Sequence, residues 1–379
     1  MTQDKTHKVS NVPPLRFPEF SGEWEKFALS DFTERVTRRN KGNACRLPLT
    51  ISAQYGLVDQ ITFFNKQIAS ADMSNYYLMK KGEFTYNKSY SGDYPWGAVK
   101  RLDRYDEGCL SSLYICFSLK PFVNSDFITH YFETTKWYRG VSEIAGEGAR
   151  NHGLLNIAIP DYFATKHYLP ASSEEQQKIA DLFNLLTKRI ETQIRVIDKL
   201  ESLIKGISKM LLAKQGNTCI KDCLICNSST LQESTVSESG KYPAWGATGI
   251  SGYIKTPQVE QDAILIIKDG ASVGNVRYVS GRYGVIGTLN YLTAKSGYNL
   301  KYLYFCLRIF NFTPFITGLA IPHIYFRDYG NAQIYCTNIS DQKQIAEELS
   351  NIEGKIEIEK QIVDKLKEQK NYLLSQMFI

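Results

Sequence analysis

Residues 172–214 read SSEEQQKIADLFNLLTKRIETQIRVIDKLESLIKGISKMLLAK, and this stretch decides the fold. Pro170 precedes it, and Ser172 with Glu175 has the spacing of a helix capping box. A heptad spacing follows, which predicts a long helix that pairs through a coiled-coil seam. The seam positions alternate at intervals of three and four and have one polar interruption: Phe183, Leu186, Ile190, Gln193, Ile197, Leu200, Ile204, Ile207 and Leu211.

The same pattern returns 166 residues later, where Asp364-Lys365-Leu366 repeats Asp198-Lys199-Leu200. The shifted seam has its polar interruption, Glu359, at the position that matches Gln193. Its members are Leu349, Ile352, Ile356, Glu359, Val363, Leu366, Lys370, Leu373 and Met377. Internal repetition on this scale indicates a duplicated architecture. We therefore divide the chain into a first block at 1–171, a first helix at 172–214, a second block at 215–339 and a second helix at 340–379.

Each seam is too narrow to be buried by its own helix, so the two helices are expected to pair with each other. The first leads away from the first block and the second starts where the second block ends, which predicts an antiparallel pair. The seam at 183–211 spans about 43 Å at 1.5 Å per residue, and one turn of DNA spaces two half-sites by about 34 Å. A plain coiled-coil dimerisation spacer has the same pattern, so the helices alone leave both interpretations open.

Both blocks are rich in Tyr, Phe and Gly and in short runs that favour β-strands, which predicts α+β domains with curved or barrel-like sheets and long functional loops. The expected strands include 82–86, 113–117 and 263–267. Short helical stretches are expected at 126–138 and 300–310.

Composition and charge restrict the class of protein. The first 172 residues have 21 basic and 18 acidic side chains, and residues 215–340 have 10 and 7, so each block has a net charge of +3. A mild surplus of this kind permits nucleic-acid binding without proving it. No apolar run approaches the roughly 20 residues that span a bilayer, and the polar N-terminus has no signal-peptide core, so we expect a cytoplasmic protein without a membrane partner.

Metal binding is not expected from the eight cysteines, which are interpreted as free thiols. Cys219, Cys223 and Cys226 cluster, but no second ligand pair follows at the spacing of a zinc site.

The first block contains basic and amide side chains of the kinds that contact DNA. Arginine reads guanine edges and asparagine reads adenine edges, whereas lysine and serine contact phosphates. One basic loop holds Arg35, Arg38, Arg39, Lys41 and Arg46. The other candidates are Asn87, Lys88, Tyr90, Lys100, Arg101, Arg150, Asn151 and His152. A charge run is as often a solvated face as a binding site.

The second block has two glycine-rich stretches, at 242–253 and 268–276. Neither has the GxxxxGK[ST] spacing of a P-loop or the GxGxxG of a dinucleotide site, so nucleotide binding is not expected. The glycines are expected in tight turns close to a DNA backbone. The DNA-binding candidates here are Tyr253, Lys255, Lys268, Ser272, Asn275, Arg277 and His323.

The order of these motifs resembles the specificity subunits of type I restriction–modification systems over nearly the whole chain. Residues 13–25, with the run Pro-Pro-Leu-Arg-Phe-Pro-Glu-Phe, resemble the N-termini of many such subunits. Residues 76–89 resemble one variety of their target-recognition domain, and 242–253 with 268–276 resemble another. The stretches 174–180 and 342–346 resemble the starts of the two spacer helices of the family. The region of Cys219 departs from the usual start of a recognition domain and lacks a counterpart to Trp24.

The resemblance implies two target-recognition domains in a pseudo-twofold arrangement, separated by the antiparallel helices. Each domain would read one half of a split, asymmetric target in double-stranded DNA. The subunit would bind two methyltransferase subunits, which bind S-adenosylmethionine and methylate adenine, and a translocating restriction subunit can join them. The chain itself would need no cofactor and would catalyse nothing.

Two other classes of protein, an adenine methyltransferase and a coiled-coil adaptor, are alternatives to a DNA-reading subunit. An adenine methyltransferase needs an Asn/Asp-Pro-Pro-aromatic loop, but the only Pro-Pro pair, Pro13-Pro14, is followed by Leu15. None of the five histidines has an HxE or HExxH spacing, so catalysis is not expected. A coiled-coil adaptor without sequence readout would explain the heptads. It would not explain the duplicated basic, aromatic blocks.

Overall fold

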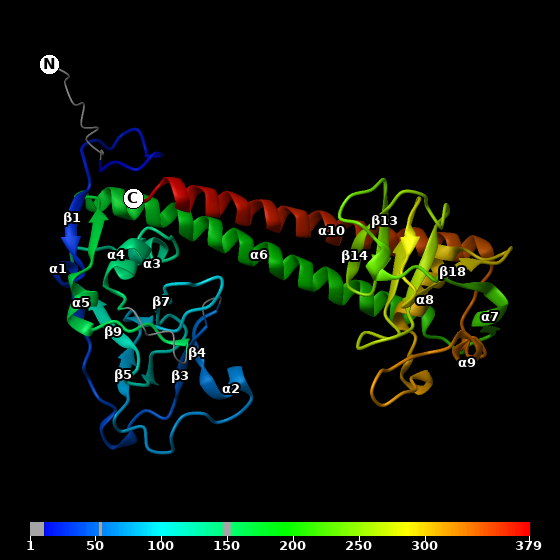
Figure 1. The fold of residues 1–379 in the computed structure, drawn as a ribbon, viewed down its shortest axis with the longest axis horizontal. Helices are drawn as coiled ribbons and strands as arrows, with labels where there is room; N and C mark the ends of the chain where they lie inside the picture. The colour runs from blue at the N-terminus through cyan, green and yellow to red at the C-terminus, as the bar shows by residue number, and fades with distance from the viewer. Residues whose placement is uncertain (1–10, 53–54, 147–152) are drawn as a thin grey trace. The chain divides into compact units, whose positions relative to one another are not determined.

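The computed structural model describes residues 11–52, 55–146 and 153–379, and it divides into two compact units (Figure 1). Unit 1 comprises Met1–Thr192 and Asp364–Ile379, and unit 2 comprises Gln193–Val363. Each unit therefore contains one mixed α/β block and parts of both long helices, α6 (Ser173–Leu212) and α10 (Ile339–Gln376).

The two long helices pair antiparallel within each unit. In unit 1 the ring of Phe183 lies 5.7 Å from that of Phe378, and Lys370 donates to Thr187 at 2.9 Å. In unit 2 the amide of Gln193 donates to the carboxylate of Glu359, so the two polar interruptions of the seams contact each other. All eighteen seam positions expected from the sequence are buried or half-buried. The coiled-coil prediction is therefore confirmed.

The start of α6 differs in one detail from the capping box that the sequence suggested. Ser172 Oγ accepts a hydrogen bond from the backbone N of Glu175 at 3.2 Å, which is the N-cap half of the motif. The Glu175 side chain does not return to Ser172. It is buried and binds Arg16 at 2.7 Å and Trp24 Nε1 at 3.2 Å, because a buried carboxylate requires a charged or hydrogen-bonding partner.

The block of unit 1 opens with a strand–helix–strand unit, β1 (Glu25–Ala28), α1 (Leu29–Phe32) and β2 (Thr33–Arg35). β1 pairs antiparallel with β10 (Lys166–Leu169), which leads into α6. The main sheet continues from β2 through β9 (Ile115–Leu119) and β6 (Phe84–Asn87) to β7 (Ala98–Arg101), and all its pairs are antiparallel. The remaining elements are β3 (Leu49–Ser52), β4 (Gly56–Asp59), α2 (Gln60–Phe64), β5 (Tyr77–Lys80), β8 (Glu107–Leu110), α3 (Ser125–Tyr131), α4 (Tyr138–Ile144) and α5 (Ile159–Ala164).

The block of unit 2 repeats this topology. It opens with β11 (Thr218–Cys219), α7 (Ile220–Cys223) and β12 (Leu224–Ser228), and β11 pairs with β19 (Gln333–Ile334), which precedes α10. Its main sheet runs from β12 through β18 (Leu289–Ala294) and β15 (Ala263–Ile267) to β16 (Val276–Val279), again antiparallel throughout. The other elements are β13 (Tyr242–Gly246), β14 (Gly249–Ile254), β17 (Gly284–Val285), α8 (Leu300–Ile309) and α9 (Phe326–Tyr329).

The expected α+β class is confirmed, with two differences in detail. The helix expected over 126–138 ends at Tyr131 as α3, because the chain turns there and Thr134 N donates to Tyr131 O at 3.0 Å, and a second helix, α4, begins only at Tyr138. The sheets are small and open, so a barrel is not formed among the described residues. The helix expected over 300–310 corresponds to α8, and the strand at 263–267 is β15.

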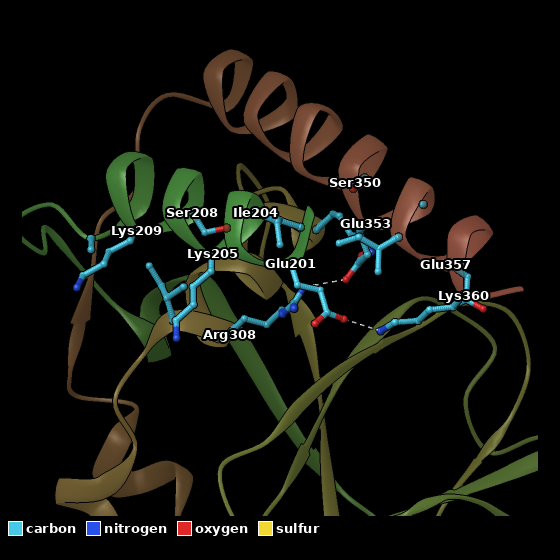
Figure 2. A pocket seen from close by; sticks show the side chains of 15 residues that line it. Glu201, Ile204, Lys205, Ser208, Lys209, Arg308, Ser350, Glu353, Glu357 and Lys360 are labelled. Carbon is cyan, nitrogen blue, oxygen red and sulfur yellow. Dashed lines mark hydrogen bonds and ion pairs between the residues drawn. The ribbon is translucent and has the colours of Figure 1, made fainter. Parts of the chain in front are cut away.

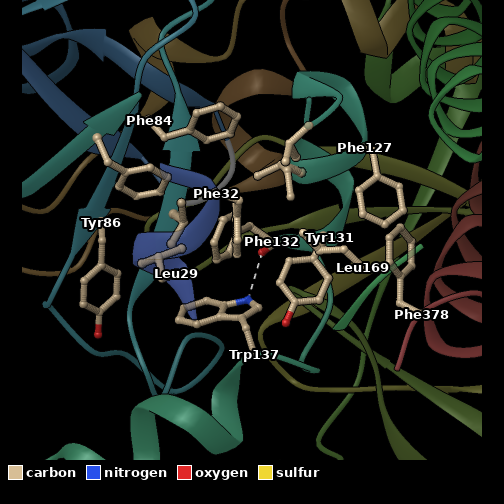
Figure 3. Close-up of a cluster of buried hydrophobic side chains, with 14 of the residues drawn as sticks. Leu29, Phe32, Phe84, Tyr86, Phe127, Tyr131, Phe132, Trp137, Leu169 and Phe378 are labelled. Carbon is tan, nitrogen blue, oxygen red and sulfur yellow. Dashed lines mark hydrogen bonds between the residues drawn. The ribbon is translucent and has the colours of Figure 1, made fainter. Parts of the chain in front are cut away.

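Aromatic side chains form the core of unit 1 (Figure 3). Trp137 is buried and donates from Nε1 to Phe132 O at 3.2 Å. Phe378, which follows α10, packs 5.2 Å from Phe127 and 6.1 Å from Tyr131, both in α3. Burying each such ring contributes roughly 2 kcal/mol, so the end of α10 is an integral part of this core.

Candidate nucleic-acid interface

Equivalent loops of the two blocks carry the main DNA-binding candidates. The first follows β6 and contains Asn87, Lys88 and Tyr90, and the second follows β15 and contains Lys268, Ser272 and Asn275. β6 and β15 occupy the same place in the strand order of their sheets. The candidates were chosen from residue type alone, and the fold places them at corresponding positions.

Each of these loops is joined in the same way to the segment that leads to the last short helix of its block. In unit 1, Leu155 N donates to Lys88 O at 2.9 Å and Tyr90 N donates to Gly153 O at 3.2 Å. In unit 2, Ile324 N donates to Lys268 O at 2.9 Å and Gly270 N donates to Pro322 O at 2.9 Å. Each block thus presents two loops held together by backbone hydrogen bonds, which we call its loop pair.

The loop pair of unit 1 has half-buried candidates. Asn87 ends β6, and its side-chain oxygen accepts a hydrogen bond from Ser89 N at 3.0 Å, which shapes the turn. Lys88 and Tyr90 follow and are half-buried. Arg150, Asn151 and His152, also expected to contact DNA, lie outside the described residues.

The basic loop of the first block is partly committed to intramolecular contacts. Arg38 forms an ion pair with Glu83 at 2.7 Å and also donates to Leu78 O at 3.1 Å. Arg39 stacks 4.4 Å from the centroid of the Tyr77 ring, and Arg35 donates to the Tyr77 hydroxyl at 3.4 Å. Lys41 is exposed in the short 3₁₀ turn Lys41–Asn43 and is the more accessible charge for a phosphate.

Lys100 and Arg101 lie at the end of β7, and Arg101 contacts residues of α3. Arg101 bonds Asp103 at 2.6 Å and Asp126 at 2.7 Å. Burial lowers the pKa of Lys100, Glu133 acts in the opposite direction, and Lys370 on α10 adds to the lowering. Arg101 therefore has protein partners in the structure, and the contact of either side chain with DNA stays a prediction.

The loop pair of unit 2 brings His323 to the stretch 268–276, which contains Lys268, Ser272 and Asn275. Asp269 and His323 form a bridge between the two loops. Ser272 and Asn275 are exposed, and Gly274, at φ +88°, allows the turn between them. An added Cβ at Gly274 would lie 2.9 Å from Phe312 Cβ, so this position requires glycine.

The remaining candidates of unit 2 lie on neighbouring strands. Tyr253 on β14 and Lys255 just after it are exposed. Arg277 on β16 stacks 5.0 Å from the centroid of the Trp245 ring on β13, which fixes its guanidinium beside the loop pair.

Two features near the loop pair of unit 2 were missed by sequence reasoning. Arg327 stacks 4.6 Å from the centroid of the exposed Tyr325 ring, an arrangement suited to contact with a base or sugar. Leu319 is completely exposed. The run Tyr325-Phe326-Arg327 could have indicated the first feature, whereas no motif distinguishes Leu319 from a buried leucine.

A groove of about 1070 Å³ in unit 2 lies among α6, α8 and α10 (Figure 2). Its charges are largely paired, since Lys360 binds Glu201 at 2.7 Å and Glu353 binds both Lys301 and Arg308 at 2.9 Å. In unit 1, Lys370 contacts Glu133 at 2.9 Å and stands at the seam position that matches Ile204 in the groove lining.

Among the described residues no group of three or more His, Cys, Asp or Glu side chains is placed to hold a metal ion. All eight cysteines lie in the described ranges and are free thiols. No helix of the described part of the chain is both long enough and apolar enough to cross a membrane.

The second block and most of the helix that follows it are similar to known proteins. Residues 218–368 match the family model of the type I restriction modification DNA specificity domain. The specificity subunit of the type I restriction enzyme EcoprrI from Escherichia coli is 26% identical over 109 residues, which cover 29% of this chain and 27% of that relative's length.

Comparison with solved structures extends the match to the fold of the whole chain. The specificity subunit of the type I restriction–modification system of M. genitalium aligns with a TM-score of 0.63 and 17% identity, over 97% of this chain and 99% of that one. A chain from a study of complex assembly and conformational transition of the type I R-M system aligns with a TM-score of 0.55 and 14% identity, over 94% and 97%. The resemblance noted in the sequence is therefore confirmed: residues 218–368 match the type I restriction modification DNA specificity domain, and the fold of the chain is similar to that of type I specificity subunits.

Proposed function

We propose that this chain reads a bipartite, asymmetric target in double-stranded DNA, with one half read by the block within 1–171 and the other by the block within 215–339. The proposal is supported by the equivalence of the two loop pairs, one in each block. The two are joined by the same backbone hydrogen bonds but present different side chains. Equivalent positions with different donors and acceptors suit two half-sites of different sequence.

The side chains have distinct roles in this proposal. Asn87 and Asn275 read base edges, and Lys88, Lys268 and Ser272 contact phosphates. Lys41, Lys255 and Tyr253 contact the DNA backbone at the edges of the half-sites. Methylation and restriction are assigned to partner subunits: two methyltransferase subunits that bind S-adenosylmethionine, and restriction subunits that can join them. The helices 172–214 and 340–379 set the unread gap between the half-sites.

The test is co-expression of the chain with its methyltransferase subunit, followed by genome-wide mapping of methylated adenines by single-molecule sequencing. The expected result is one motif with two short halves around a fixed gap. Asn275→Ala should relax one half of the motif and Asn87→Ala the other, while Lys199→Ala on the exposed face of α6 should change neither. An assembled complex without methylation would favour the alternative, a coiled-coil adaptor that binds only protein.

A further inference from the structure

A tight hairpin projects from the segment between α8 and α9, drawn as an orange loop in Figure 1. Thr317 and His323 exchange two backbone hydrogen bonds, with N···O distances of 2.9 and 2.8 Å. Gly318 has φ +89°, and an added Cβ would lie 2.3 Å from Ile321 O. The turn is thus fixed by its own backbone, which holds the intervening side chains in place.

The base of the hairpin is part of the loop pair of unit 2. Pro322 O accepts from Gly270 N and Ile324 N donates to Lys268 O, both at 2.9 Å. Any duplex bound by Lys268, Ser272 and Asn275 would therefore lie beside the hairpin. Its position follows from the same contacts that define the proposed reading site.

The tip of the hairpin is apolar and exposed to solvent. Leu319 has a relative exposure of 108% and Ile321 of 66%, so neither contributes to the core of its block. Exposed apolar side chains mark an interaction site when they stand together, as Leu319 and Ile321 do on this hairpin. A tip one side chain wide is too narrow for an extended protein interface, but it matches the apolar wedges with which proteins separate stacked bases.

The surroundings of the tip suit a nucleic acid. His323 and the stacked pair of Tyr325 and Arg327 flank it, and Lys268 lies at its base. Of the nearby acidic residues, Asp328 has its carboxylate 3.7 Å from Arg327, whereas Asp269 is joined to His323 through its backbone. We propose that Leu319 inserts as a wedge between two base pairs of the half-site read by unit 2, with Ile321 packed against the unstacked base.

This inference rests on the proposed function, and its test separates the two. The full chain, assembled with its methyltransferase subunit, is mixed with target duplexes that carry 2-aminopurine at successive positions of each half-site. Unstacking should raise the fluorescence at one step of the second half-site by about threefold or more, and at no step of the first. Leu319→Ser should abolish the rise and weaken specific binding about tenfold or more, whereas Leu319→Met, which keeps a long apolar side chain, should preserve both.

A matched control is Leu113→Ser, which removes another exposed leucine from the turn before β9 and should leave the signal unchanged. Specific binding without any unstacked position, together with unaltered affinity of Leu319→Ser, would overturn the wedge and leave the proposed function standing. Loss of assembly with the methyltransferase in Leu319→Ser would identify a protein contact and also overturn the wedge. A complex that binds target and unrelated duplexes equally would overturn the proposed function itself.

Discussion

Gln176 and Gln342 make the same pair of hydrogen bonds, one in each unit. The side-chain oxygen of Gln176 accepts from Asn124 N at 2.8 Å, and that of Gln342 accepts from Asn299 N at 2.9 Å. Their amide groups donate to Pro170 O at 3.0 Å and to Thr337 O at 2.7 Å. Asn124 and Asn299 are the N-caps of α3 and α8. Each long helix is therefore fastened to the corresponding helix of its block by one buried glutamine.

Replacing this glutamine should destabilise its unit. Gln342→Ala would leave Asn299 N and Thr337 O without their partner in a buried site, at a cost of about 1–3 kcal/mol in the free energy of unfolding. Urea unfolding followed by circular dichroism would measure the loss. Gln344→Ala is the matched control, because that exposed glutamine bonds only Glu348 on the same helix, at 3.1 Å. Equal effects of the two substitutions would contradict the assigned role.

The contact between Gln193 and Glu359 should appear as a coupling energy. Gln193→Leu and Glu359→Leu each remove one partner from a half-buried pair, whereas the double substitution makes this step of the seam apolar. A double-mutant cycle on the free energy of unfolding is expected to give about 0.5–1.5 kcal/mol. Strict additivity of the two single substitutions would show that the hydrogen bond contributes nothing to pairing.

Glu133 should make the stability of unit 1 depend on pH. Burial raises the pKa of this carboxyl, but the His130 hydrogen bond and the Lys370 charge outweigh it and lower the pKa to about 2. Because the folded pKa is depressed, the stabilisation is present above the ordinary pKa near 4.5 and is lost as the pH falls toward 2.

The comparison of wild type with Glu133→Gln isolates this contribution. The free energy of unfolding, measured with urea at pH 6, should be higher for the wild type by about 1 kcal/mol, because solvent screens this partly exposed carboxylate, and the difference should shrink steadily between about pH 4.5 and pH 2. Glu143→Gln removes an exposed ion pair with Arg139 and should show no comparable trend. A difference between Glu133→Gln and wild type that is constant across this range would refute the prediction.

The salt dependence of DNA binding should identify phosphate contacts. If Lys41 neutralises one phosphate, Lys41→Ala lowers the slope of log K against log salt by about 1 and weakens all sequences alike. Fluorescence anisotropy at several salt concentrations would measure the slope. Lys199→Ala on α6 removes one positive charge, as Lys41→Ala does, but should leave the slope unaltered. Arg38→Ala is a less direct test, since its loss also removes the partner of Glu83.

The helical part of the architecture followed from the sequence because heptad spacing is a local property. The heptad position of each seam residue predicts which face of the helix it lies on. The repeat at 166 residues also predicts that Gln193 and Glu359 are equivalent, and the two contact each other in the structure. The start of α6 was only half predictable. Ser172 signals an N-cap locally, but the partner of Glu175, Arg16, lies 159 residues away in the sequence.

The candidate site was less predictable because it depends on long-range pairing of loops. Residue type selected Lys268 and His323 separately, whereas their proximity comes from backbone hydrogen bonds between segments about fifty residues apart. Residue type also cannot distinguish an accessible cation, Lys41, from Arg38, whose guanidinium is paired with Glu83. Exposure of an apolar tip residue such as Leu319 depends on the turn at Gly318 and has no sequence signature.

The glutamine fastening has a consequence for how such a protein can evolve. Gln176 and Gln342 bond main-chain atoms of their blocks, and main-chain atoms are the same whatever side chains a block carries. A block could therefore be replaced by one of unrelated surface, provided that it keeps a capped helix and the strand that leads into the long helix. New specificities could then arise by exchanging one half of the protein at a time, without redesign of the part that both halves share.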